Sequence, residues 1–252
     1  MTSCSEAPSA FEGILRGEDS RDELRWLLDL RATHTGSVDD RVRILLEWAT
    51  LEEEVFGSAE NASDLYRRVL NAEASNGVAL RALPRLLLAA GDASGAAVVI
   101  AQHRDQLSGE ERAAREVELA ELYIGQLGRH HDALEASVRA LELSPGNARA
   151  IAVLEQLVEH EGTRAAAAEV LAQQYATGGE ARREAQALSV MLEQAKRRAE
   201  RLKLYGRLAE VHEEKLNAHG TALDIALRAV REYPDELPLW DRADGVAPVA
   251  GR

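Results

Sequence analysis

Apolar residues recur every three or four positions along most of the chain. The spacing is clearest in residues 44–55, 117–127 and 204–216. It places the apolar side chains on one face of an α-helix. No segment alternates polar and apolar positions for long enough to indicate a β-strand. The sequence therefore predicts an all-α fold.

Short turn signals separate these apolar stripes, for example Gly57-Ser58, Gly178-Gly179 and Pro234-Asp235. The pieces between the turns are mostly about 12–18 residues long, which is the length of ordinary helices. We therefore expect about twelve helices, with each helix antiparallel to the next. Short polar side chains at the starts of helices predict these N-caps: Asp92, Ser108, Ser144 and Thr163.

Three stretches of the chain repeat one pattern of small residues. Each begins with an apolar residue followed by alanine, and another alanine follows thirteen positions later. Small residues at matching points let two antiparallel helices approach to about 8–10 Å. A proline after the second helix would end it. The members of the three copies are Ala49, Ala62, Tyr66, Val69 and Ala74; Ala120, Ala133, Ser137, Ala140 and Pro145; and Ala209, Ala222, Ala226, Ala229 and Pro234.

This pattern resembles the tetratricopeptide repeat (TPR) family, with a first helix about one residue longer than usual. The resemblance covers roughly residues 40–235. It implies a right-handed α-solenoid of antiparallel helix pairs, with a concave face that binds proteins. The match is clearest at Leu119, Ala120, Tyr123, Ala133, Ala140 and Pro145, and again at Leu208, Ala209, Ala222, Ala229 and Pro234. Weaker pairs are expected at 77–90 with 93–106 and at 147–160 with 163–176.

The spacing between the copies predicts extra helices. The second interval is 18 residues longer than the first, which is enough for one helix and its turn. The 18 extra residues lie in 179–198. They form either an added helix that ends at a break near Lys196–Ala199 or part of one long helix that runs to about Leu216. We favour the break. Another added helix is expected at Asp22–Ala32.

The expected organisation has three parts. A polar N-terminal segment covers residues 1–20, the TPR-like solenoid covers 21–236, and a C-terminal tail covers 237–252. Among the tryptophans, Trp26 and Trp48 are expected in helix seams, whereas Trp240 is expected to be exposed.

Composition narrows the classes of partner. The 252 residues carry a formal charge of −13, which disfavours binding to a nucleic-acid backbone.

A single cysteine, Cys4, cannot form an internal disulfide. The N-terminus lacks the apolar run of a secretory signal, and the longest aliphatic stretches are far short of the ~20 residues that span a bilayer. We therefore expect a cytoplasmic protein with no membrane partner. The excess of arginine over lysine suggests a high-GC bacterial genome.

The seven histidines form no catalytic or metal-binding pattern in the sequence. His130 and His131 are adjacent, so on a helix their side chains point in different directions. His212-Glu213 begins a possible HExxH zinc motif, but Leu216 stands where the second histidine is required. No glycine-rich phosphate loop or nucleophile elbow is present. The sequence therefore predicts no enzymatic activity, no cofactor and no metal.

The resemblance also implies which residues contact a partner, because the first helix of each pair lines the concave face. By position these residues are Arg43, Thr50, Glu53 and Glu54; Glu121; and Lys203, Glu210, Glu213 and Glu214. They are mostly acidic, so a basic or amphipathic segment of a protein is the expected partner. The family's carboxylate-clamp positions carry Leu46, Val117 and Gly206, then Thr50, Glu121 and Glu210, which disfavours binding of a terminal carboxylate.

The leading interpretation is a non-enzymatic scaffold that binds another protein. Two alternatives stay open. The chain could be a structural module that self-assembles as a homo-oligomer through its terminal helices, or an accessory domain of a larger complex.

Overall fold

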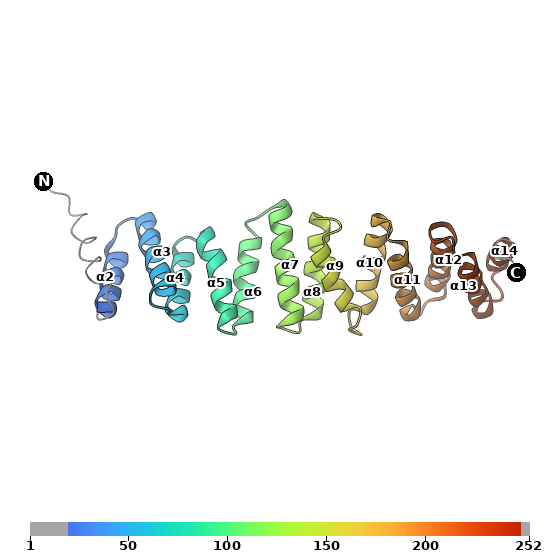
Figure 1. The fold of residues 1–252 in the computed structure, drawn as a ribbon, viewed down its shortest axis with the longest axis horizontal. Coiled ribbons are helices and arrows are strands. Elements are labelled where there is room, and N and C mark those ends of the chain that lie inside the picture. The colour runs from blue at the N-terminus through green and yellow to red at the C-terminus, as the bar shows by residue number, and fades with distance from the viewer. Residues whose placement is uncertain (1–19, 248–252) are drawn as a thin grey trace. The chain divides into compact units, whose positions relative to one another are not determined.

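The computed structural model describes residues 20–247, and this part of the chain is helical with short turns (Figure 1). It contains thirteen α-helices and one π-helical turn, with no strand among the described residues. The predicted all-α fold of antiparallel helix pairs is confirmed. The chain divides after Leu107 into two compact units, which are described separately below.

The described part of unit 1, residues 20–107, contains five helices, and successive helices pack against one another. The closest pairs are α3 with α4 and α5 with α6. The helix before the first repeat, predicted at Asp22–Ala32, is present as α2. The bounds are α2 Arg21–His34, α3 Val38–Glu54, α4 Ala59–Ala72, α5 Gly77–Ala89 and α6 Ala93–Arg104.

Unit 2 continues the pattern of packed neighbours, and α7 with α8 is its closest pair. Helix α10 packs more extensively against α11 than against α9, and α9 also contacts α7. The bounds are α7 Gly109–Gly125, α8 His130–Leu143, α9 Ala148–Leu157, α10 Arg164–Gly178, α11 Ala181–Gln194, α12 Arg198–Glu210, the π-helical turn Val211–Lys215, α13 His219–Glu232 and α14 Leu237–Val246.

Two boundaries in unit 2 bear on the sequence predictions. The predicted break near Lys196–Ala199 is confirmed, because α11 ends at Gln194 and α12 begins at Arg198. The segment expected as a C-terminal tail begins with a helix, α14. Its residues Ala243 and Val246 pack against Ala222 and Ala226 of α13, so the packed helices continue to Val246.

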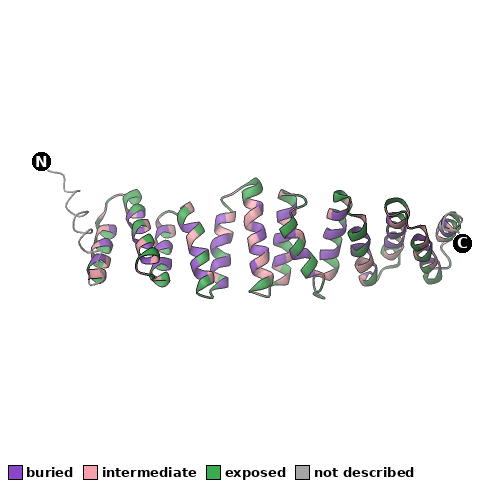
Figure 2. Ribbon diagram, viewed as in Figure 1, coloured by how far each residue is buried: buried purple, intermediate pink, exposed green. Residues whose placement is uncertain are grey.

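The alanines of the repeat lie in the seams between helices, as predicted. The first alanine of each copy, on α3, α7 or α12, is at most 1% exposed. Its counterpart on the following helix is fully buried in all three copies. Figure 2 shows the buried residues along the helix sides that face neighbouring helices. A seam with only methyl groups at these points brings the two backbones close together.

The predicted helix caps are correct only in part. Asp92 caps α6 by accepting a hydrogen bond from the backbone N–H of Gly95 at 2.8 Å. The prediction for Ser144 is wrong, because Ser144 ends α8 and the side chain of Asn147 caps α9. Thr163 stands before α10, but its hydroxyl donates to the carbonyl of Leu157 instead. Ser108 occupies the cap position of α7 without a side-chain cap bond.

One left-handed residue closes the first helix in each copy of the repeat. Gly57, Gly128 and Asn217 have φ angles of 66°, 62° and 50°. Each stands eight positions after the first alanine of its copy. In the second copy the N–H of Leu127 bonds to the carbonyl of Leu122, five residues back. This wider turn accommodates the extra residue of the first helix.

We expect Gly128→Ala to destabilise the protein by about 1 kcal/mol, because a left-handed backbone is costly for a residue with a Cβ atom. A Cβ at Gly128 would meet no atom within 4 Å, so the cost is purely conformational. Gly125→Ala is the matched control. It lies within α7 and also in open space, so it should stabilise by up to about 1 kcal/mol. Urea unfolding that gave both variants the same sign of change would contradict the assignment.

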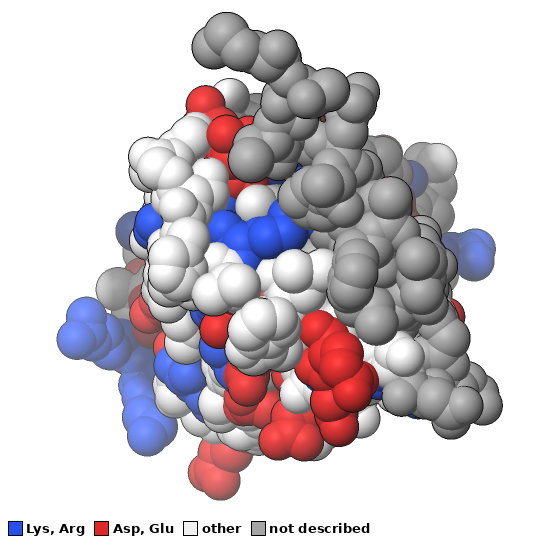
Figure 3. All heavy atoms as spheres, turned by 90° about the vertical axis from the view of Figure 1, so that its left-hand side faces the viewer, with Lys and Arg blue, Asp and Glu red and all other residues white. Residues whose placement is uncertain are grey.

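The exposure of the tryptophans corrects one prediction. Trp48 is buried at 8% exposure and Trp240 is 45% exposed, as predicted. The prediction for Trp26 is wrong, because this residue of α2 is 66% exposed. The buried face of α2 is formed by Leu24, Leu28 and Ala32 instead. Figure 3 looks onto the end formed by α2 and shows uncharged side chains beside acidic and basic ones.

Candidate protein-binding groove

Alternate helices of unit 2 are joined along one face by ion pairs between glutamate and arginine. Arg149 of α9 binds Glu121 of α7 through two hydrogen bonds of 2.9 and 2.6 Å. Arg183 of α11 lies 3.8 Å from Glu155 of α9. The second ion pair links α9 to α11, and α10, which lies between them in sequence, is in contact with both.

A groove of about 260 Å³ lies between α9 and α11. Its residues come from three helices, α9, α10 and α11, and from the two residues after α9. The apolar part of the lining consists of Val158, Leu171, Tyr175, Ala187 and Val190. The polar part consists of Glu155, Glu159, Arg183 and Gln186. The groove thus combines an apolar surface with charged groups.

Helical spacing explains why these side chains share one space. The α11 residues Arg183, Gln186, Ala187 and Val190 have the i, i+3, i+4, i+7 spacing of one helix face. Leu171 and Tyr175 are one turn apart on α10. The neighbouring buried alanines of α10 keep that helix close to α9 and α11, so its two larger side chains reach the groove.

A hydrogen-bond network holds Tyr175 in place. Its hydroxyl donates to Oε1 of Glu155 at 2.5 Å, and the Arg183 guanidinium lies 5.6 Å from the centre of its ring. Burial raises the pKa of Tyr175, and the hydrogen bond to the Glu155 carboxylate raises this pKa further. Tyr175 therefore stays protonated. Its side chain lines the groove although it is only 4% exposed, and its hydroxyl is already hydrogen-bonded to Glu155. These contacts fix the orientation of Tyr175 at the groove.

The partner-contact residues predicted in unit 1 lie on α3. Arg43, Thr50 and Glu54 are exposed. Arg43 forms an ion pair with Asp40. Glu53 is half-buried and binds Arg85 of α5, so its charge is already balanced by a neighbouring helix.

The residues predicted in unit 2 are divided between α7 and the region of α12. Glu121 is bound by Arg149, as described above. Lys203 and Glu210 are exposed on α12. The π-helical turn after α12 carries the half-buried Glu213 and the exposed Glu214.

None of the nine predicted residues lines the groove between α9 and α11. Sequence reasoning missed this groove because it followed the three clear copies, and the groove lies between the second and third. A usable signal was present in α11, where Ala187 and Val190 continue the face that carries Arg183.

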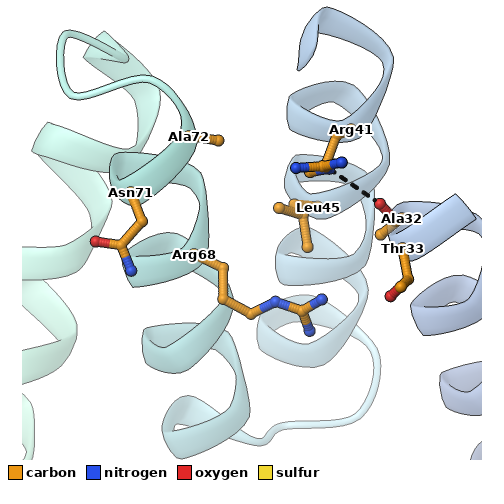
Figure 4. A pocket seen from close by; sticks show the side chains of 7 residues that line it. All are labelled: Ala32, Thr33, Arg41, Leu45, Arg68, Asn71 and Ala72. Atoms are coloured by element: carbon orange, nitrogen blue, oxygen red, sulfur yellow. Dashed lines mark hydrogen bonds between the residues drawn. The ribbon is translucent and has the colours of Figure 1, made fainter. Parts of the chain in front are cut away.

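Unit 1 contains a larger pocket, of about 370 Å³, among α2, α3 and α4 (Figure 4). Its two arginines already hold the helices together. Arg41 donates to the carbonyl of Ala32 at 3.2 Å, and Arg68 donates to Asp29 at 2.9 Å. Leu45, the bulkiest apolar residue of the lining, is only 1% exposed. This pocket offers less apolar contact area to a partner than the groove between α9 and α11.

None of the described helices has the length and apolar character needed to cross a membrane. Across residues 20–247, no group of three or more His, Cys, Asp and Glu side chains is arranged to hold a metal ion.

Similarity to known proteins is confined to distant structural likeness. No protein-family model matches the sequence, and no curated protein is similar to it. A tetratricopeptide repeat protein from Parabacteroides merdae is 14% identical, with 96% of this chain and 98% of that chain covered and a TM-score of 0.41. YrrB, a TPR protein with an unusual peptide-binding site, is 15% identical, with 79% and 89% covered and a TM-score of 0.34.

The TPR2AB domain of yeast Sti1, in its complex with pHSP90, is 12% identical. The alignment covers 82% of this chain and 83% of that chain, with a TM-score of 0.37. Likeness at this level concerns helical-repeat architecture alone. The helix pairs and the buried alanines themselves define the fold.

Proposed function

We propose that the protein is a non-enzymatic scaffold that binds a segment of another protein in the groove between α9 and α11. The observation that carries the proposal is the groove itself, which combines an apolar surface with a fixed tyrosine and charged groups. Peptide sites of this kind take an apolar side chain as an anchor and use polar groups around it for orientation.

The chemistry of the groove favours a segment with an aliphatic side chain beside a lysine or arginine. Val158 and Val190 are half-buried and supply apolar contact to the aliphatic group. Glu159 is exposed at the same groove and supplies negative charge to the basic group. The net charge of −13 also favours the approach of a basic segment. The exposed residues Thr50, Glu54, Lys203, Glu210 and Glu214 stay proposed contacts elsewhere on the protein.

A peptide-display selection against the protein tests this function. We expect the selected peptides to share an aliphatic residue next to a basic one. Val190→Asn should weaken their binding about tenfold or more in fluorescence anisotropy, because it replaces an apolar contact in the groove with a polar amide. Val98→Asn is the matched control, since Val98 is 68% exposed in unit 1. Failure to select any peptide, or equal losses in the two variants, would overturn the proposal.

Self-assembly is a second candidate, favoured by exposed apolar residues on terminal helices of the described chain. Trp26 of α2 is 66% exposed, and Leu237 of α14 is 73% exposed. Large apolar side chains at such positions are a frequent sign of a contact surface. Sedimentation over a range of protein concentrations separates the two candidates. If the protein self-assembles, its average molecular mass should rise with concentration. At any one concentration, the Trp26→Ser variant should then have a lower average mass than the unmodified protein.

A further inference from the structure

Another pocket in unit 2, of about 220 Å³, gathers three histidines from two separate segments. His130 and His131 begin α8, and His160 follows α9 in the turn before α10. The rings of His130 and His160 are stacked, with centroids 3.7 Å apart. Although His130 and His131 are adjacent, both line the pocket. The other lining residues are Gly128, Arg129, Asp132, Gly162 and Thr163.

Hydrogen-bond donors predominate in this pocket. Each imidazole carries at least one N–H group, and Arg129 carries five. Arg129 is held in place by a 2.7 Å hydrogen bond to Asp132 and by its position 4.8 Å from the centre of the Tyr123 ring. Helix α8 begins here, and no side chain caps its first turn. Its first backbone N–H groups add positive electrostatic potential to the side-chain donors.

The arrangement suits an oxyanion better than a metal ion. No metal-holding group is found in the described part of the chain, which includes this pocket. Asp132 is the one carboxylate in the lining, and its charge is balanced by Arg129.

We propose that this pocket binds a phosphate dianion, either as inorganic phosphate or as a phosphate monoester. The ligand oxygens accept hydrogen bonds from His130, His131, His160 and the Arg129 guanidinium. Phosphate offers several acceptor oxygens, which match the excess of donors. The site shares no residue with the groove between α9 and α11. The phosphate proposal therefore does not depend on the proposed scaffold function.

Titration of the ¹⁵N-labelled protein with inorganic phosphate tests the site. We expect saturable shifts of the backbone signals of His131, Asp132 and Gly162 as phosphate rises to about 50 mM. Sodium chloride at matched ionic strength should not reproduce them, because chloride lacks the several acceptor oxygens. The absence of saturation, or equal shifts with chloride, would overturn the proposal.

Variants test which side chains bind the ion. His130→Ala combined with His160→Ala should weaken phosphate binding about tenfold or more. His34→Ala is the control, because His34 lies in α2 of unit 1. Asp132→Asn should instead strengthen binding several-fold, because it removes a negative charge from the pocket. This gain keeps the proposal testable if the double variant fails to fold, and unchanged affinity in Asp132→Asn would count against the site.

A peptide with one phosphoserine, beside its unphosphorylated form, distinguishes the two sources of phosphate. If the phosphopeptide binds about tenfold more tightly than inorganic phosphate, the site belongs to a phosphorylated segment of a partner protein. Binding of the phosphopeptide no tighter than that of the free ion would assign it to inorganic phosphate. In both cases the unphosphorylated peptide should leave the pocket signals unchanged. Equal shifts of these signals by the two peptides would contradict a phosphate site.

Discussion

Arg25→Met is expected to destabilise the protein by about 3 kcal/mol, because it leaves the carboxylate of Glu52 buried without its cation. Glu52 is fully buried on α3. Arg25 of α2 donates two hydrogen bonds of 2.7 Å to it, one to each oxygen. Trp48 adds a third hydrogen bond at 2.9 Å. The free energy of unfolding in urea measures the loss.

Two further variants separate the buried charge from other effects. Arg43→Met removes an exposed ion pair on α3 and should change stability by less than about 0.5 kcal/mol. Adding Glu52→Gln to Arg25→Met should recover much of the loss, because the neutral amide still accepts a hydrogen bond from Trp48. No recovery in the double variant would show that the methionine harms packing and that the buried charge is not responsible.

The same ion pair predicts a pH dependence of stability. Burial acts to raise the pKa of Glu52, but hydrogen bonds from Arg25, Trp48 and Asn61 outweigh burial and hold this pKa below its ordinary value. A carboxylate with a lowered pKa stabilises the fold above its unfolded pKa, and this contribution is lost as pH falls. Arg25→Met should therefore lose less stability on acidification than the unmodified protein, as urea unfolding at several acidic pH values would show.

Ala133→Leu is expected to cost about 2 kcal/mol, because it adds three carbon atoms to a seam that has no space for them. Ala133 is fully buried between α7 and α8, the closest helix pair of unit 2. Ala222→Leu should have a similar effect between α12 and α13, since Ala222 holds the same place in its copy and is also fully buried. Thermal unfolding measures both changes.

Ala166→Leu is the control for added volume. Ala166 is exposed on α10, next to the fully buried Ala167. Leucine is nearly as good a helix former as alanine, so this variant should change stability by less than about 0.5 kcal/mol. If Ala133→Leu and Ala166→Leu were equally stable, the repeated alanines would not define the helix seams.

Local periodicity was sufficient to predict most of the fold. The spacing of apolar residues, the turn signals and the repeated alanines such as Ala120 and Ala133 led to the helix pairs, the break before α12 and the added helix α2. These features depend on residues a few positions apart in the chain, so the amino-acid sequence alone is enough to predict them. Trp26 shows the limit, because its apolar character indicated a seam although no described helix covers that face of α2.

The proposed binding sites depend on contacts between residues far apart in the sequence. Periodicity correctly placed Glu53 and Glu121 on the first helices of their pairs, but not their partners Arg85 and Arg149, which lie about thirty residues away on other helices. The groove at Tyr175 and the pocket at His160 likewise join segments that no local pattern connects.

The sequence by itself determined that this protein is all-α, that its helices pack in pairs, and that small residues occupy the seams. These properties follow from the 3.6-residue period and from side-chain volume, which are local. The tertiary structure alone decided which charges are paired, where the surface is hollowed, and which histidines meet. Those outcomes depend on how separate helices are juxtaposed, because an ion pair or a pocket requires atoms from several helices at defined distances.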